Sequence, residues 1–345
     1  MRKIFVTFAL VAGIIFIISQ IQDFGSILET IQRSKLRYLF AASLIQSIWL
    51  VNVAALYRTI YRVIGIKESL KQMILIAAAA NFVNVVTPTA GVGGMAVLIS
   101  EARRKDYSSG KTTVASAMYV LFDYLAFLGV LALGLFVLFR RDQLQMTEII
   151  ATGILVLIAG TIAALLYLGM YSEEKLGRFL AWGGKVVNKL VGPFRRNTTK
   201  DYLSIDRAYS FAHDIAEGMR ELQGKPRELV FPLLLALNSK ILLILVLLFV
   251  FLAFGVPPSF GTLIAGFSIA FLFMIVSPTP NGVGFVESAL TLTLASFYIP
   301  LSDAAVIAIT YRGVTYWLPI LFGFIAMRWL GGVEKVTPAQ PPNLE

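Results

Sequence analysis

The chain has 345 residues, of which 57% are hydrophobic and 14% are charged, and it contains no cysteine. A soluble domain carries about 25% charged residues, so this composition predicts an integral membrane protein. The absence of cysteine excludes disulfides, thiolate metal sites and cysteine nucleophiles. The net charge of +10 does not indicate nucleic-acid binding, because the basic residues are distributed as membrane topology requires.

Six apolar runs have about the 20 residues that an α-helix needs to cross a hydrocarbon core. They are continuous rather than alternating, which is typical of membrane helices and not of barrel strands. The first run lacks a small-residue cleavage site, so we expect an uncleaved span rather than a signal peptide. The runs are Ile4–Ile21, Tyr38–Ala55, Thr112–Phe139, Ile149–Tyr171, Leu229–Phe254 and Ala304–Trp329.

A shorter apolar stretch after the second run is interrupted by proline and glycine. Met73–Val86 is followed by Thr87-Pro88-Thr89-Ala90-Gly91-Val92-Gly93-Gly94 and by a return arm that ends near Ser100. As a helix, Gly91–Ser100 would cover only ~15 Å, about half of the core. Because both flanks are basic, we predict a re-entrant hairpin that enters from the cytoplasm and turns near mid-membrane.

A second stretch repeats this pattern late in the chain. Its core is Val276-Ser277-Pro278-Thr279-Pro280-Asn281-Gly282-Val283-Gly284, with one residue more before the first glycine. Its longer arms leave a full crossing open, but charge counting places both flanks outside. We therefore predict an inverted-topology repeat within one membrane domain, 38–139 and 229–329, in which broken helices form a substrate site. The alternative is that proline and glycine only kink two helices for packing.

Lysine and arginine cluster in alternate loops. By the positive-inside rule, both termini and the connection 172–227 are cytoplasmic, in a plasma-membrane protein. Apolar residues recur at helical spacing in this connection with basic residues between them, which indicates an amphipathic helix on the inner leaflet. A linker helix packed on the bundle is the alternative. His213 lies in the same connection, and we expect a solvated side chain without a role.

Four ionisable residues interrupt apolar segments. Asp123, Lys240, Glu287 and Arg312 would each be costly if exposed to lipid, so each is expected to face the bundle or water. Two acids and two bases make pairing plausible, and the alternative to a functional site is a set of ion pairs that lock helices. Glu287 and Arg312 flank the second broken loop, which favours function.

The two return arms should begin at Gly94 and Gly284, where helix N-termini would direct N–H groups towards mid-membrane. This arrangement favours an anionic, phosphate-bearing headgroup, and Arg312 and Lys240 agree with it. The acids could instead receive a cationic group or a coupling proton. The glycine-rich loops do not fit a nucleotide fingerprint, and no metal or cofactor motif is present.

These segments resemble the lysylphosphatidylglycerol synthase transmembrane, or flippase-like, family, over nearly the whole chain. The similar residues are Asn81, Pro88, Gly91–Gly94, Arg103-Arg104, Asp123, Pro278, Gly282–Glu287, Tyr311-Arg312 and Tyr316–Pro319. Val120 departs from the pattern, because relatives often carry an arginine there. The resemblance implies a module that moves lipids or lipid-linked molecules between leaflets. Larger members are fused to a soluble aminoacyl-transferase domain, which we expect to be absent here, so the chain is not expected to be an enzyme.

The leading hypothesis is therefore a transporter that flips a lipid or lipid-linked anionic molecule. Alternatives are a secondary transporter of a small anion and a non-transporting partner of an envelope lipid or glycan synthase. Membrane lipids are the expected partners. The candidate substrate-binding residues are Pro88, Gly91, Gly93, Gly94, Asp123, Lys240, Pro278, Gly282, Gly284, Glu287, Arg312 and Tyr316.

The predicted topology can be tested directly, because the chain contains no cysteine. A single cysteine at Lys189, within 172–227, should react with a membrane-impermeant maleimide only after the cells are opened. Labelling of this cysteine in intact cells would overturn the orientation. A cysteine at Arg141, in a predicted external loop, serves as the positive control.

Overall fold

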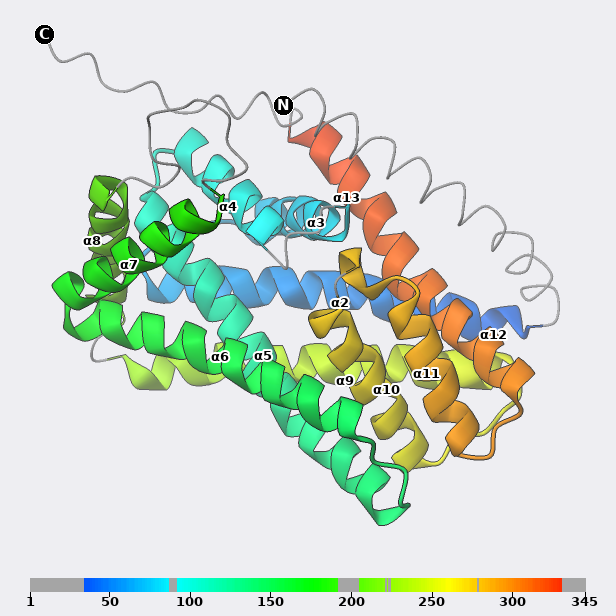
Figure 1. Cartoon of the computed structure of the whole chain (residues 1–345). Helices are drawn as coiled ribbons and strands as arrows, with labels where there is room; N and C mark the ends of the chain where they lie inside the picture. Colours follow the sequence, from blue (N-terminus) through cyan, green and yellow to red (C-terminus); the bar gives the residue numbers. More distant parts are fainter. Residues whose placement is uncertain are drawn as a thin grey trace, which may run out of the picture.

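The structure, a computed structural model, describes residues 34–86, 92–191, 205–220, 222, 225–277 and 279–330. Every regular element in these ranges is helical, which confirms the predicted all-α membrane bundle, and five segments are long and apolar enough to span a membrane. The predicted first span, Ile4–Ile21, and both termini lie outside the described residues. The spans are α2 (Leu36–Val63), α5 (Ser109–Arg140), α6 (Met146–Tyr171), α9 (Val230–Ala253, preceded by the turn Pro226–Leu229) and α12 (Leu301–Arg312) continued by α13 (Leu318–Trp329) (Figure 1).

Two pairs of shorter helices occupy the positions of the predicted hairpins. The first pair is α3 (Leu70–Val86) and α4 (Val92–Arg104), and the second is α10 (Phe260–Val276) and α11 (Phe285–Ser296). The two helices of each pair pack on each other instead of continuing as one helix. The prediction that the first return arm begins at Gly94 is wrong by two residues, since α4 begins at Val92.

The backbone explains why α10 and α11 are separate helices. A short 3₁₀ turn, η3 (Pro280–Gly282), connects them, and Asn281, Gly282 and Gly284 have φ angles of 49°, 73° and 83°. Such left-handed conformations are incompatible with a continuing α-helix and favour glycine and asparagine. A Cβ on Gly282 would also lie 2.9 Å from Met274 Cα, so the turn requires glycine for both conformation and space.

The first helices of the two halves lie side by side and run in opposite directions. Figure 1 shows α2 and α9 in this arrangement, and hydrogen bonds fix it at both ends. Lys35 N donates to Ala253 O at 2.8 Å, and Asn52 Nδ2 donates to Leu235 O at 2.9 Å. An inverted repeat would require such an antiparallel pair; the repeat itself stays a prediction.

Each hairpin packs its first helix against the last span of the other half, α3 against α13 and α10 against α5. Glycines permit both contacts. A Cβ on Gly323 would lie 2.3 Å from Phe82 Cβ, and a Cβ on Gly134 would lie 2.3 Å from Ser268 Oγ. The halves are therefore interlocked through helices that approach at glycine.

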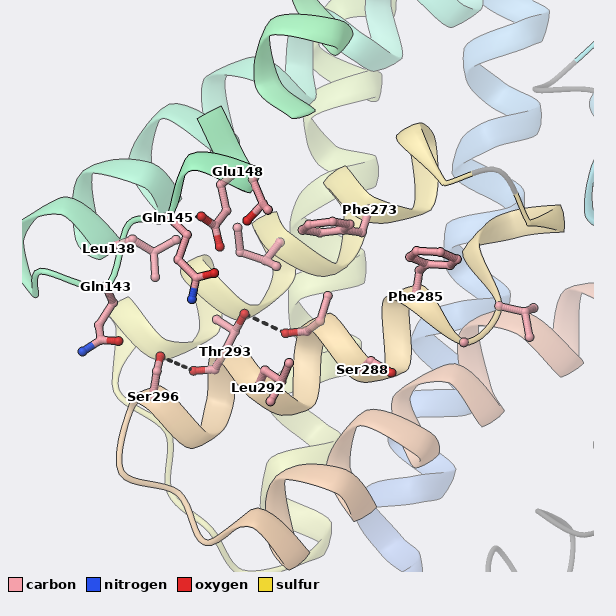
Figure 2. A pocket seen from close by; sticks show the side chains of 15 residues that line it. Leu138, Gln143, Gln145, Glu148, Phe273, Phe285, Ser288, Leu292, Thr293 and Ser296 are labelled. Carbon is pink, nitrogen blue, oxygen red and sulfur yellow. Dashed lines mark hydrogen bonds between the residues drawn. The ribbon is translucent and has the colours of Figure 1, made fainter. Parts of the chain in front are cut away.

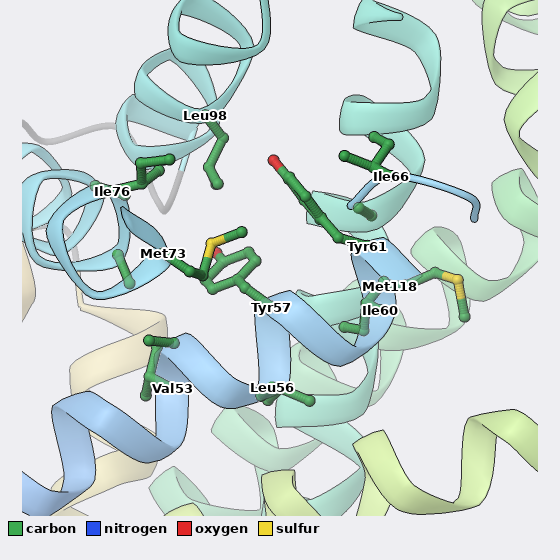
Figure 3. Close-up of a cluster of buried hydrophobic side chains, with 14 of the residues drawn as sticks. Val53, Leu56, Tyr57, Ile60, Tyr61, Ile66, Met73, Ile76, Leu98 and Met118 are labelled. Atoms are coloured by element: carbon green, nitrogen blue, oxygen red, sulfur yellow. The ribbon is translucent and has the colours of Figure 1, made fainter. Parts of the chain in front are cut away.

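The apolar core has two main parts. One fills the space between α2, α3, α4 and α5, where Figure 3 shows Leu56, Ile60, Met73 and Leu98 among the buried side chains. The other joins α5 and α9 to α10, α11 and α12, and the fully buried Phe267 is part of it. The broken second hairpin is thus held by apolar packing on several sides, which keeps the η3 turn in a fixed position.

The connection 172–227 contains two described helices, α7 (Glu173–Val191) and α8 (Ile205–Arg220). They pack on each other, and α8 also packs on α5 and α6, in agreement with the alternative of a linker packed on the bundle. The expectation that the His213 side chain is solvated is confirmed, since it is exposed, and its Nδ1 also lies 2.8 Å from Glu173 Oε1. The sequence could not reveal this pair, since its partners lie on different helices.

The glycine contact between α5 and α10 can be tested by adding a single methyl group. Gly134→Ala should destabilise the bundle by about 1–3 kcal/mol, because the new Cβ overlaps Ser268 and the helices must separate. Gly129→Ala on the same helix is the matched control, since no atom lies within 4 Å of its Cβ position. It should be neutral or stabilising by up to about 1 kcal/mol, from helix propensity.

Both effects are measured as thermal unfolding in detergent. Ser268→Gly should restore stability in the Gly134→Ala background by removing the overlapping side chain. Equal stability of the two alanine variants would contradict the close packing of α5 on α10.

Candidate functional site

A cavity of about 150 Å³ lies at the centre of the bundle. Asp123 and Lys240, which line it, are near the middle of α5 and α9, and Arg312 is near the middle of the last span. The cavity therefore lies at about half the depth of the spanning helices. Three of the four predicted charges meet there, and Asn281 of the η3 turn forms part of the same wall.

The first ion pair joins the two halves of the chain. Lys240 Nζ lies 2.6 Å from Asp123 Oδ1, and it also lies 3.9 Å from the centre of the Phe271 ring. The side chain of Lys240 is 1% exposed and that of Asp123 is 14% exposed. The ion pair and the cation–π contact together offset the desolvation of this buried lysine.

The second ion pair connects the last span to the broken loop. Arg312 Nε donates to Glu287 Oε1 at 2.9 Å, and Arg312 Nη2 donates to the carbonyl of Asn281, also at 2.9 Å. The guanidinium carbon lies 4.9 Å from the centre of the Tyr316 ring. The predicted pairing of two acids with two bases is confirmed, and Arg312 holds both η3 and α11 at once.

Glu287 uses its other oxygen to cap α11. The N–H of Gly284 donates to Glu287 Oε2 at 2.7 Å, so the partial positive charge of this helix N-terminus faces a carboxylate of the protein itself. The Gly284 N–H is therefore already bonded within the protein, and its role in binding a substrate anion stays a prediction. No other atom lies within 4 Å of a Cβ built on Gly284, which leaves open space beside the cap.

The glycines of the first broken segment are described only in part. Gly94 N donates to Asn84 Oδ1 at 2.6 Å, and a Cβ on Gly94 would lie 2.5 Å from Asn84 Nδ2, so this glycine permits close packing of α4 on α3. Gly93 is buried in the first turn of α4. The predicted site residues Pro88, Gly91 and Pro278 lie outside the described residues.

The described parts of the two broken segments come together at the cavity. Helix α3 contacts η3, and Asn81 of α3 lines the same cavity as Asn281 of η3. The second loop thus reaches the centre of the bundle, as predicted. The approach of the first loop itself stays a prediction, because residues 87–91 are not described.

Several residues of the cavity wall were missed from the sequence. Trp49, Tyr119 and Phe271 line the cavity, and Trp49 Nε1 donates to Ser239 Oγ at 2.7 Å. Aromatic residues in an apolar run look the same whether they face lipid or protein. The available signal was the polar residue next to Lys240 in the sequence, since Ser239 accepts the hydrogen bond that holds Trp49.

A larger groove of about 490 Å³ begins beside the broken loop and opens between helices. Val283, Gly284 and Phe285 line one part of it, and Gln145 and Glu148, at the start of α6, line another. Figure 2 shows residues of α11 along one side of the groove and residues of the α5–α6 region along the other. The groove connects the vicinity of Gly284 with the end of the bundle where α5 meets α6.

The buried Asp123–Lys240 pair should show strong coupling in a double-mutant cycle. Asp123→Leu should destabilise the protein by about 3–5 kcal/mol, because it leaves the Lys240 ammonium buried without a counter-charge. Adding Lys240→Met should recover most of that loss, since an apolar pair requires no desolvation.

The exposed pair of Glu174 and Arg178 on α7 serves as the control, with side chains 77% and 64% exposed. Its removal by Glu174→Ala should change stability by at most about 0.5 kcal/mol. The free energy of unfolding of each variant is measured in a denaturant series. A coupling near zero between Asp123 and Lys240 would contradict the buried pair.

Comparisons with known proteins agree with the helical membrane architecture. Two UPF0104 membrane proteins of Methanothermobacter thermautotrophicus are 23% and 24% identical, and the matches cover 89% and 96% of this chain and 89% and 94% of the relatives. The UPF0104 membrane protein MJ1595 of Methanocaldococcus jannaschii is 24% identical over 327 residues, covering 93% of this chain and 94% of the relative. No solved structure matches the chain. The family described as "Lysylphosphatidylglycerol synthase TM region" matches residues 4–323, and the chain therefore belongs to this family.

Proposed function

We propose that this protein translocates a lipid or lipid-linked molecule with an anionic headgroup between the two leaflets. The observation that carries the proposal is the Arg312–Glu287 ion pair. Arg312 lies near the middle of the last span, and it holds the broken helix through its bonds to Glu287 and to the carbonyl of Asn281. Charges at this depth are expensive, and broken helices at mid-membrane are typical of transporter substrate sites.

The contacts of Glu287 suggest how an anion would enter. One carboxylate oxygen accepts from Arg312 and the other accepts from the Gly284 N–H. A phosphate or carboxylate offers the same acceptors at similar spacing, and arginine recognises both groups through parallel N–H bonds. A headgroup anion would therefore replace the Glu287 carboxylate at both positions and release the α11 cap.

The size of the central cavity indicates that the structure is closed. A volume of about 150 Å³ is below the roughly 300–1,000 Å³ that is typical of small-molecule sites. Translocation requires the cavity to widen, and the exchange of Glu287 for a substrate anion would loosen η3 and α11 from the last span.

The groove beside α11 favours a lipid over a small soluble anion. A lipid must keep its chains in the bilayer while its headgroup crosses, which requires an opening between helices. The groove provides one, because it opens between the start of α6 and the hairpin helices α10 and α11. A small anion would instead need a water-filled vestibule closed to lipid.

The cellular setting follows from the same proposal. We place the protein in the plasma membrane with cytoplasmic termini, in contact with its lipid substrate and with an envelope enzyme that makes or uses that lipid. Translocation needs no catalytic residue, in keeping with a non-enzymatic role. A protein that only scaffolds such an enzyme would need neither the central cavity nor the exchangeable pair.

Transport in proteoliposomes tests the proposal. Glu287→Gln and Arg312→Gln should each abolish movement of a fluorescent anionic phospholipid, measured by dithionite quenching, while folded protein still inserts. Glu174→Gln, which changes an exposed carboxylate on α7, should transport normally. Wild-type transport by both site variants would refute the assignment.

A purely structural role gives a different pattern. If both single variants misfold, and Glu287→Leu combined with Arg312→Leu restores a stable bundle, the pair only locks the helices. Transport of a small organic anion in place of lipid would favour the secondary-transporter alternative.

A further inference from the structure

The groove beside α11 is rich in hydrogen-bond acceptors. The hydroxyl of Thr293 donates to the carbonyl of Ala289 at 2.7 Å, and that of Ser296 donates to the carbonyl of Thr293 at 2.8 Å. Their protons are thus used within the helix, and only oxygen lone pairs are left for a ligand. Figure 2 shows these two bonds on the α11 side of the groove.

The opposite side contributes a buried carboxylate. Glu148 is 7% exposed and lines the groove, and one of its oxygens accepts from the Gln145 N–H at 2.6 Å. Among the ion pairs of the described residues, none involves Glu148. The helix cap accounts for one oxygen, and the side-chain amides of Gln143 and Gln145 line the groove beside the carboxylate.

The lining of the groove excludes several headgroups. None of its described residues is lysine or arginine, so it offers no counter-charge for a phosphate, and Glu148 would repel one. An ammonium group would suit Glu148, but a phospholipid that carries ammonium also carries a phosphate. A ligand with several O–H donors and no charge satisfies the carboxylate, the amides and the hydroxyl lone pairs together.

We propose that the groove binds the glycosyl headgroup of a glycolipid. The sugar hydroxyls would donate to Glu148, Thr293 and Ser296, while Phe285 and Leu292 contact the apolar part of the ligand. A volume of about 490 Å³ is within the range of roughly 300–1,000 Å³ that is typical of small-molecule sites.

This inference makes the proposed function more specific. It rests on that function for the statement that the transported molecule is a lipid. The groove reaches Gly284, whose N–H is capped by Glu287 in the central site. A lipid that carries both a phosphate and a sugar would therefore place the phosphate at Arg312 and the sugar in the groove. The substrate class is then a lipid-linked glycosyl phosphate.

Binding can be measured without transport. Purified protein in an amine-oxide detergent, which carries no sugar, is titrated with short-chain glucosyl diacylglycerol and observed by native mass spectrometry. Phosphatidylethanolamine and phosphatidylglycerol of the same chain length, the unglycosylated diacylglycerol and free glucose are the comparison probes. We expect glucosyl diacylglycerol to bind more tightly than the unglycosylated diacylglycerol and free glucose, with little dependence on salt. Equal binding of the unglycosylated diacylglycerol would overturn the proposal. The phospholipids, whose phosphate the proposed function places at Arg312, should bind equally well when Glu148 is replaced by glutamine, and loss of their binding in that variant would also overturn the proposal.

Glu148→Gln is the main variant, since glutamine still accepts the Gln145 N–H and so keeps the helix cap. Loss of the charged acceptor should weaken glycolipid binding about tenfold. Asp142→Asn is the matched control, because Asp142 is exposed and does not line the groove. Glycolipid binding by this variant should be unchanged. Unchanged binding by Glu148→Gln would refute the role of this carboxylate.

Thr293→Val provides a second variant that is independent of the α6 cap. Valine keeps the shape of the side chain and removes the acceptor oxygen, so glycolipid binding should fall severalfold at unchanged thermal stability. If Glu148→Gln does not fold, this variant decides the outcome. Glycolipid binding without lipid transport would refute only the proposed function, whereas transport without glycolipid binding would refute only this inference.

Discussion

Inside a hydrocarbon core, every backbone polar group and every charge must find a partner within the protein. A broken helix leaves backbone groups without hydrogen-bond partners, and a buried arginine lacks a counter-charge. Here the arginine and the broken helix supply partners for each other. Arg312 donates to the free carbonyl of Asn281, and Glu287 accepts the free N–H of Gly284 while it neutralises Arg312. The hydroxyl of Thr279 completes the turn by donating to the Val283 carbonyl at 2.9 Å. The ion pair and the break in the helix therefore depend on each other.

Each half of the chain has a charged residue and a close glycine contact at the same spacing in its last span. Gly134 follows Asp123 by the same number of residues as Gly323 follows Arg312, and each glycine receives the first helix of the opposite hairpin. The charge thus precedes the helix contact by the same number of residues in both halves. The difference is the partner: Asp123 pairs across the halves with Lys240, whereas Arg312 pairs within its own half. Movement of the two halves against each other would consequently strain the Asp123–Lys240 pair, whereas Arg312 and Glu287 would move together within their own half.

Much of this architecture could be predicted because membrane spans and helix breaks leave local signals. Continuous apolar runs predicted the five described spans, and Pro280 with Gly282 and Gly284 predicted the break. The balance of charges predicted pairing, but not that Asp123 pairs with Lys240, since that choice depends on how α5 packs on α9. The cap formed by Glu287 and the walls formed by Trp49 and Phe271 were missed for a related reason. They depend on rotamers and on which face of a helix is covered, and an apolar run does not encode either.

Under the proposed function, the buried charges have a second role, in which a ligand exchanges with the Glu287 carboxylate. Replacing a buried ion pair by apolar residues is often neutral or stabilising, so the ion pair between Arg312 and Glu287 contributes to stability chiefly through the backbone groups of the broken helix that it satisfies. Their contacts are of a kind that an anionic ligand can reproduce, so substituting one carboxylate for another changes the free energy less than simply breaking the pair. A ligand shifts a conformational equilibrium only through its differential affinity for the two states. A headgroup that occupies both positions of the Glu287 carboxylate has this differential affinity, because those positions are filled by the protein itself in the closed bundle.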